Sequence, residues 1–113
     1  MDNVIIIGTG KIGIDLYIKC KKSKKFKDIF IFNRSKNSEG AKFCIKKKYN
    51  YSHLGIEGVK KKLHNSKFIF DATSASSNIK TLKILKNKIK NKYFINLTPS
   101  KNGKYIVPFI NKK

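Results

Sequence analysis

The chain has 113 residues, of which 40% are hydrophobic, and this is enough for one domain with a modest core. Lysine and arginine together number 27 against 6 acidic residues, which gives a formal net charge of +21. Its apolar runs are far shorter than the ~20 residues of a membrane-spanning helix, and its first residues lack the basic start of a secretion signal. The sequence therefore predicts a cytoplasmic protein without a membrane partner.

The high positive charge raises the question of nucleic-acid binding. Arg34 is the only arginine, so nearly all of the positive charge is lysine. Proteins that read nucleic acids usually use arginine for two-pronged contacts with bases, and these lysines are spread over most of the predicted helices. We interpret the charge mainly as solvated surface that attracts RNA non-specifically. A basic RNA-associated protein stays open as an alternative.

An N-terminal strand, turn and helix form the most informative pattern. The apolar run at residues 4–7 leads directly into Gly-x-Gly-x-x-Gly, and an amphipathic segment follows from residue 11 to about residue 22. In such a context Gly8 allows the tight turn, Gly10 lets the backbone approach a pyrophosphate, and Gly13 lets the helix lie near the strand. The free N–H groups that begin the helix attract phosphate. We therefore expect a dinucleotide-binding turn at residues 8–13.

Strands alternate with helices along the rest of the chain. This order predicts a parallel sheet with right-handed crossovers, that is, an α/β fold with a Rossmann-like doubly wound sheet in a single domain over residues 1–113. The expected strands are residues 4–7, 28–32, 49–51, 68–70 and 93–97, with a turn-rich loop at 98–103 and an extended apolar segment at 105–110. The expected helices are residues 11–22, 38–48, 55–63 and 78–90.

Helical spacing also predicts which side chains face the core. The expected inward-facing residues are Ile12, Leu16 and Cys20 on the first helix, Ala41, Cys44 and Ile45 on the second, and Ile79, Leu82, Leu85 and Ile89 on the last. Because Cys20 and Cys44 fall into this spacing and form no CxxC pair, we interpret them as small core residues rather than metal ligands or catalytic thiolates. His53 and His64 are isolated, and neither is expected to be functional.

The second strand ends in Asn33-Arg34-Ser35. A site for NAD usually has a carboxylate here that binds the adenosine ribose, and this carboxylate is missing. Asp28 lies at the wrong end of the strand to replace it. Arg34 either accepts the 2′-phosphate of NADP or is an exposed loop residue.

Small polar residues follow the strand at residues 68–70. The segment from Asp71 to Ala75 would lie at the carboxyl edge of the sheet, where ligands bind in such folds. Asp71 either belongs to this site or braces the turn.

Three stretches of the chain resemble one family. They are residues 6–16 around the glycine motif, residues 70–75 with the sequence Phe-Asp-Ala-Thr-Ser-Ala, and residues 96–111 with Asn-Leu-Thr-Pro and Val-Pro-Phe-Ile-Asn. A weaker match covers Ser-Glu-Gly at 38–40 and Gly-Ile-Glu-Gly at 55–58. On these residues the chain resembles the N-terminal NAD-binding domain of acetylating acetaldehyde dehydrogenase.

The resemblance implies the reaction of acetaldehyde, CoA and NAD⁺ to acetyl-CoA and NADH. It also implies that Thr9, Gly10, Lys11 and Ile12 line the cofactor pyrophosphate, that Ser74 and Ala75 approach the nicotinamide, and that 4-hydroxy-2-oxovalerate aldolase is the family's partner. The family's catalytic cysteine lies in a second domain, beyond the position equivalent to Asn111. We therefore expect this chain to be inactive alone, with its catalytic half either encoded separately or lost.

The chain departs from the family at Lys11, at Ser76 and at the end of the second strand. A stand-alone NAD(P)-binding module without catalysis stays open as an alternative function.

Overall fold

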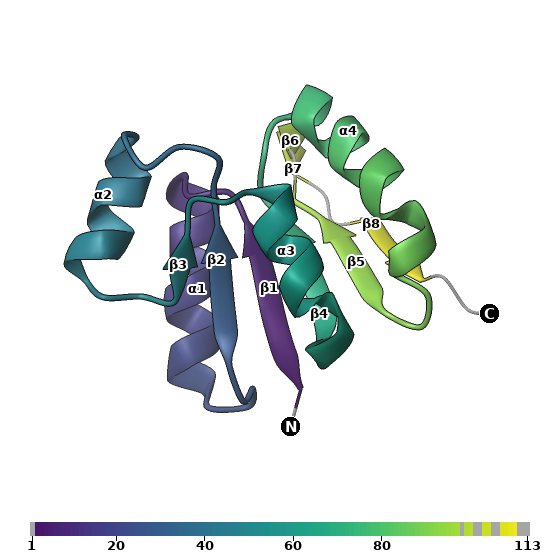
Figure 1. Ribbon diagram of the computed structural model, residues 1–113, viewed down its shortest axis with the longest axis horizontal. Helices are drawn as coiled ribbons and strands as arrows, with labels where there is room; N and C mark the ends of the chain where they lie inside the picture. Colours follow the sequence, from purple (N-terminus) through teal and green to yellow (C-terminus); the bar gives the residue numbers. More distant parts are fainter. Residues whose placement is uncertain (1, 98, 101–102, 105–106, 111–113) are drawn as a thin grey trace.

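The computed structural model describes residues 2–97, 99–100, 103–104 and 107–110, and these form an α/β sandwich (Figure 1). Its main helices are α1 (Lys11–Ser23), α2 (Glu39–Lys46), α3 (Ile56–Lys62) and α4 (Ala75–Leu85), with short 3₁₀ turns η1 (Leu63–Asn65) and η2 (Lys86–Lys88). Its strands are β1 (Asn3–Ile7), β2 (Ile29–Phe32), β3 (Tyr51–Ser52), β4 (Ser66–Asp71), β5 (Tyr93–Asn96), β6 (Pro99–Ser100), β7 (Gly103–Lys104) and β8 (Val107–Ile110).

The main sheet has the strand order β3-β2-β1-β4-β5-β8. The first five strands are parallel, as the sequence predicts, and the chain changes direction across the sheet between β1 and β4. Ile7 at the end of β1 pairs with Phe32 on one side and with Asp71 on the other. The loops that follow β1, β2 and β4 therefore lie side by side at the carboxyl edge, which is the usual ligand position in such a sheet.

The C-terminal segment adds structure that the sequence pattern does not predict. Within the described residues, β8 pairs antiparallel with β5, and β6 pairs with β7 in a small separate ribbon. The expected loop at 98–103 therefore contains paired backbone. Residues 98, 101–102 and 105–106 lie outside the described part.

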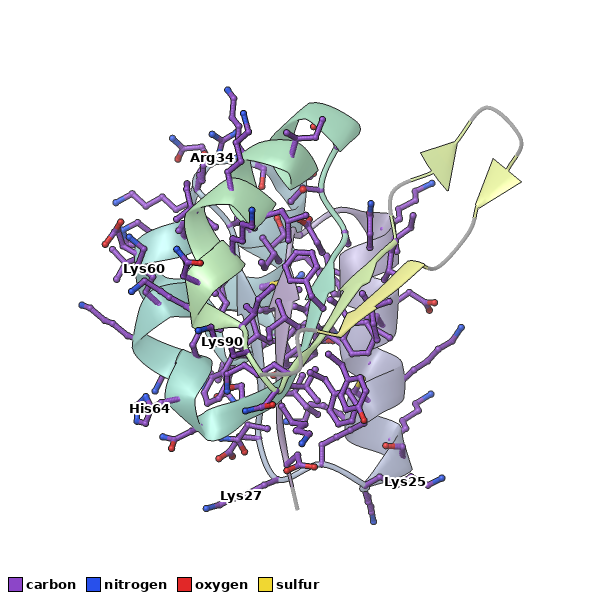
Figure 2. The ribbon with its side chains drawn as sticks, turned by 90° about the vertical axis from the view of Figure 1, so that its right-hand side faces the viewer. Lys25, Lys27, Arg34, Lys60, His64 and Lys90 are labelled. Atoms are coloured by element: carbon purple, nitrogen blue, oxygen red, sulfur yellow. The ribbon has the colours of Figure 1, made fainter. Side chains whose placement is uncertain are left out.

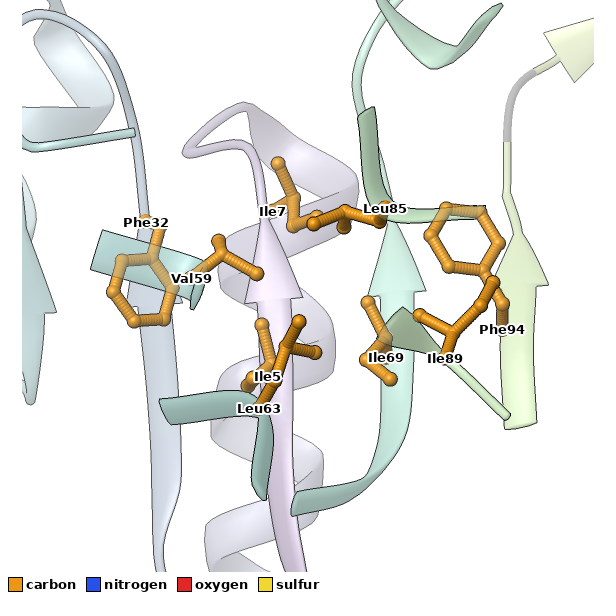
Figure 3. Packing of buried hydrophobic residues seen from close by; sticks show 9 residues of the cluster. All are labelled: Ile5, Ile7, Phe32, Val59, Leu63, Ile69, Leu85, Ile89 and Phe94. Atoms are coloured by element: carbon orange, nitrogen blue, oxygen red, sulfur yellow. The ribbon is translucent and has the colours of Figure 1, made fainter. Parts of the chain in front are cut away.

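Two apolar clusters hold the helices on the two faces of the sheet. On one face, side chains of α3 and α4 and the turns after them pack on the central strands (Figure 3); the residues are Ile5, Ile7, Phe32, Val59, Leu63, Ile69, Leu85, Ile89 and Phe94. The other cluster joins α1 and α2 to the opposite face, through Val4, Ile6, Tyr17, Cys20, Ile29, Ile31 and Cys44. Because both faces of β1 are covered, all five of its residues are buried and the four after Asn3 are apolar.

The buried face of α1 differs from the prediction. It consists of Gly13, Tyr17 and Cys20, while Ile12 and Leu16 are only half-buried beside it. Tyr17 is buried because its ring stacks on Tyr49 with centroids 4.4 Å apart, and its hydroxyl accepts a hydrogen bond from the backbone N–H of Asn50 at 2.9 Å.

The second and last helices show smaller differences. On α2, Ala41 and Cys44 are buried as predicted, but Ile45 is 54% exposed. On α4, Leu85 is buried, whereas Ile79 is 57% exposed. Helix α4 also begins at Ala75 rather than near residue 78, because the Ser74 hydroxyl accepts the backbone N–H of Ser77 and caps the helix.

Charges are distributed unevenly between the two edges of the sheet. Basic residues occupy the last turns of the helices and of η2, namely Lys21, Lys22, Lys46, Lys60, Lys61, Lys62, Lys83, Lys86 and Lys88. Figure 2 shows Lys25, Lys27 and His64 at the end of the molecule opposite Arg34. Positive side chains stabilise helix C-termini. No helix in the described ranges is long and apolar enough to cross a membrane.

Candidate dinucleotide-binding site

A cavity of about 710 Å³ lies at the carboxyl edge of the sheet, where the chain switches from β1 to β4. This volume is in the range of small-molecule and cofactor sites. Its walls come from the loops after β1, β2 and β4, from the first turns of α2 and α3, and from one face of α4. The lining residues are Ile7, Gly8, Thr9, Gly10, Phe32, Asn33, Arg34, Ser38, Glu39, Gly40, Leu54, Gly55, Ile56, Glu57, Ala72, Thr73, Ser77, Lys80, Thr81 and Ile84.

The glycine turn after β1 forms the floor of the cavity. Gly8 has a φ of +112°, a conformation that favours glycine. A Cβ on Gly13 would lie 2.1 Å from the Gly8 carbonyl oxygen, so only glycine lets α1 begin this close to the strand. A Cβ on Gly10, in contrast, would have no heavy atom within 4 Å. Open space beside Gly10 is what a bound pyrophosphate needs.

The start of α1 faces the same space without a side-chain cap. Its N-cap residue is Gly10, which has no side chain to accept the first-turn N–H groups of Lys11, Ile12 and Gly13. Such N–H groups, together with the positive end of the helix dipole, form a binding site for an anion. The turn and the helix therefore fit a phosphate group.

Helix α2 packs directly against the glycine turn. A Cβ on Gly40 would lie 1.6 Å from the Thr9 carbonyl oxygen, and Thr9 itself is buried. Ser38 caps the helix by accepting the backbone N–H of Ala41 at 3.1 Å. The first turn of α2 thus brings Ser38, Glu39 and Gly40 to the cavity wall.

The loop after β2 connects this wall to α3. The Asn33 side-chain amide donates to the Ser35 carbonyl and to the Ser38 hydroxyl, both at 3.1 Å. The Asn33 carbonyl accepts the backbone N–H of Gly55 at 2.9 Å, at the start of α3. Arg34 lines the cavity, and its stem lies against Gly55, where a Cβ would be 2.8 Å from the Arg34 Cγ.

Asp71 braces the turn after β4. Its carboxylate is fully buried, and its Oδ1 accepts both the backbone N–H and the hydroxyl of Thr73. The backbone N–H of Ala72 donates to the Ile7 carbonyl at 2.8 Å, which ties this turn to the end of β1. Asp71 therefore positions Thr73 at the cavity rather than lining it.

One face of α4 forms a wall of the cavity, through Ser77, Lys80, Thr81 and Ile84 at helical spacing. Ile84 is 47% exposed there, and Leu54, before α3, is 50% exposed. Both are large apolar side chains that remain accessible within the cavity lining. Two accessible apolar residues in one cavity suit a flat, partly apolar group such as a nucleobase.

The structure brings together only part of the predicted set. Gly8, Thr9, Gly10 and Arg34 line the cavity, while Lys11, Ile12 and Gly13 form the adjacent first turn of α1. Ser74 caps α4, and Ala75 is the first residue of that helix. The prediction did not include the walls from α2, α3 and α4. For α4, the small and polar residues at positions 77, 80 and 81 were an available signal.

Comparison with known proteins agrees with this geometry. The family model for shikimate/quinate 5-dehydrogenase matches residues 1–100, which is most of the chain. The chain belongs to this family of dehydrogenase domains. The matched range contains β1 to β5 and every cavity-lining residue.

Individual relatives point to one kind of dehydrogenase. An acetaldehyde dehydrogenase of Burkholderia pseudomallei (strain 668) is 34% identical over 115 residues, which cover 96% of this chain and 36% of that protein. One of Geobacillus stearothermophilus is 32% identical over 108 residues, with the same two coverages. One of Pseudomonas sp. (strain CF600) is also 32% identical, over 111 residues. The resemblance predicted from the sequence is confirmed.

The chain spans about a third of the length of these relatives. Together, the family and the relatives support a nicotinamide cofactor for this domain. The open space at Gly10, the uncapped start of α1 and the accessible apolar side chains of Leu54 and Ile84 fit such a cofactor.

Proposed function

We propose that this chain binds NAD in the cavity at the carboxyl edge and is the NAD-binding part of an acetylating acetaldehyde dehydrogenase. The observation that carries the proposal is the open cradle at Gly10, at the start of an uncapped helix in a cavity of about 710 Å³. The similarity to acetaldehyde dehydrogenases supports the reaction, which converts acetaldehyde, CoA and NAD⁺ to acetyl-CoA and NADH.

Different residues of the cavity would bind different parts of the cofactor. The N–H groups at the start of α1 hold the pyrophosphate, because they are free of a side-chain cap. Leu54 and Ile84 contact the adenine, and the turn fixed by Asp71 places Thr73 beside the rest of the cofactor. When bound, NAD⁺ supplies the acceptor for a hydride.

The thiol that attacks the aldehyde would come from outside this chain. Cys20 and Cys44 are both buried in the cluster that joins α1 and α2 to the sheet, and neither lines the cavity. Burial raises the pKa of the thiols of Cys20 and Cys44, and therefore keeps both protonated at neutral pH. We infer that a catalytic part outside these 113 residues supplies the reactive cysteine, and that the family's aldolase partner acts with the assembled enzyme.

Calorimetric titration of the purified chain with NADH, NAD⁺ and NADP⁺ tests the binding proposal. We expect saturable binding of NAD⁺ and NADH that is lost in Gly10→Val, because the new side chain fills the pyrophosphate space. Equal affinities of wild type and Gly10→Val would overturn the assignment of the cavity. Binding to RNA that persists above physiological salt, without nucleotide binding, would favour the RNA-associated alternative.

A second experiment tests the reaction. The purified chain alone should produce no NADH from acetaldehyde and CoA, and adding a cysteine-bearing catalytic half of an acetaldehyde dehydrogenase should restore NADH formation. Robust NADH formation by residues 1–113 alone would contradict the proposal that the reactive cysteine lies outside them. Tight NADH binding that no catalytic half converts into activity would favour a stand-alone binding module.

A further inference from the structure

The end of β2 is chemically unusual for a dinucleotide site. An acidic residue commonly stands there and accepts hydrogen bonds from the adenosine ribose, but this chain has Asn33. The Asn33 amide donates to both the Ser35 carbonyl and the Ser38 hydroxyl, and its Oδ1 accepts the backbone N–H of Arg34 at 2.9 Å. Asn33 therefore holds the loop and the cap of α2 in place. Its side-chain oxygen and nitrogen both already form hydrogen bonds within the protein.

Two carboxylates nevertheless line the cavity, and they differ in their surroundings. Glu57, in the first turn of α3, forms an ion pair with Lys60 at 3.4 Å. Glu39, in the first turn of α2, takes part in neither of the two ion pairs found within the described residues. Of the two, Glu39 is the carboxylate without a cationic partner there.

Glu39 is also held close to the phosphate-binding turn. Its neighbour Gly40 touches the Thr9 carbonyl so closely that no side chain fits between them. Its other neighbour, Ser38, is bound by the Asn33 amide. The backbone on both sides of Glu39 is thus fixed, by the turn after β1 on one side and by the loop after β2 on the other.

On the basis of the proposed dinucleotide binding, we propose that Glu39 is the specificity-determining residue for the cofactor. Its carboxylate accepts a hydrogen bond from the 2′-hydroxyl of the adenosine ribose, in place of the missing acidic residue at the end of β2. The same negative charge disfavours the 2′-phosphate of NADP, so Glu39 selects NAD. Asn33 is a positioning residue, because its bond to Ser38 holds the start of α2 beside the glycine turn.

The test compares three nucleotides on matched variants. Wild type, Glu39→Gln and Glu57→Gln are titrated with NAD⁺, with NADP⁺ and with an NAD⁺ analogue that lacks the adenosine 2′-hydroxyl. Both substitutions remove one negative charge from the same cavity, so Glu57→Gln controls for the general change in potential. Urea unfolding checks that the variants are folded, and Glu39→Asp is a second variant that keeps the charge.

We expect wild type to bind the deoxy analogue about tenfold to hundredfold more weakly than NAD⁺, as for a lost hydrogen bond to a charged group. Glu39→Gln should lose a similar factor for NAD⁺, should no longer distinguish NAD⁺ from the analogue, and should bind NADP⁺ relatively better. Glu57→Gln should change the affinities for NAD⁺ and for the analogue by the same factor and so keep their wild-type ratio, and Glu39→Asp should retain the preference for NAD⁺.

Two results would overturn this inference while leaving the proposed function intact. One is a Glu39→Gln variant that still separates NAD⁺ from the deoxy analogue as wild type does. The other is a preference of wild type for NADP⁺ that disappears in the Arg34→Ala variant, which would show that Arg34 determines the cofactor preference. Absence of any nucleotide binding by wild type would overturn the proposed function, and with it the role of Glu39.

Discussion

Gly40 lies against the main chain of Thr9 so closely that a methyl group on its α-carbon would be 1.6 Å from the Thr9 carbonyl oxygen. Because the obstacle is backbone, it cannot rotate away as a side chain would. We expect Gly40→Ala to lower the free energy of unfolding by roughly 1–3 kcal/mol, as overpacking does, and to weaken NADH binding by displacing α2 from the glycine turn. Urea unfolding and NADH titration measure both effects. An unchanged unfolding midpoint would show that α2 can shift without cost.

Gly10 provides the opposite case within the same turn. A side chain there meets open space, and its φ of −78° is accessible to any residue. Gly10→Val should therefore change the free energy of unfolding by no more than about 1 kcal/mol, the scale of an N-cap substitution, while NADH binding is lost. Comparing it with Gly40→Ala separates damage to the cavity from damage to the fold. A Gly10→Val variant as unstable as Gly40→Ala would contradict this separation.

Asp71 should matter for stability more than a typical polar residue. It is fully buried and accepts the backbone N–H and the hydroxyl of Thr73. Asp71→Ala leaves these donors without their acceptor, and we expect a loss of roughly 2–4 kcal/mol in the free energy of unfolding. Asp71→Asn keeps one acceptor oxygen and should lose less. Thermal unfolding of the two variants distinguishes them, and equal losses would mean that the charge itself is what the turn requires.

The two thiols should be chemically silent in the folded chain. Burial raises the pKa of both Cys20 and Cys44 above the ordinary thiol value, so the reactive thiolate is scarce at neutral pH and is found only at higher pH than for a free cysteine. We expect a thiol reagent at pH 7 to modify both cysteines only as fast as the chain unfolds, and rapidly in urea. Fast modification of one cysteine without urea would indicate an accessible thiolate and would weaken the case for an external catalytic cysteine.

The central sheet and the glycine turn could be predicted because their signals are local. Residues 4–7 are apolar without interruption because β1 is covered on both faces. Of the glycines that follow, Gly8 has a positive φ and Gly13 packs on the Gly8 carbonyl, and both of these requirements lie within one strand, turn and helix. The Ser38 cap depends on an equally local signal, because serine favours a helix start and its hydroxyl accepts the backbone N–H of Ala41, three residues on.

Contacts between distant segments explain what the pattern missed. Spacing alone favoured Ile12 and Leu16 as the core of α1, but Tyr17 takes the buried position because Tyr49 and Asn50 supply a ring and a donor from 32 and 33 residues away. The sequence also does not show that Leu54 and Ile84 line the same cavity. They lie in different elements, and the cavity that both line exists only once the sheet has formed.

The lysine-rich edge that lies opposite the cavity has a practical consequence for handling the chain. Its helices end in basic residues at one edge of the sheet, whereas the cavity at the other edge is lined by Glu39 and Glu57 as well as by Arg34 and Lys80. A negatively charged support such as a cation-exchange bead should therefore hold the protein by its lysine-rich edge. The immobilised molecules would present their cavities to the buffer, ready to be loaded and washed with nucleotide while the protein stays on the bead.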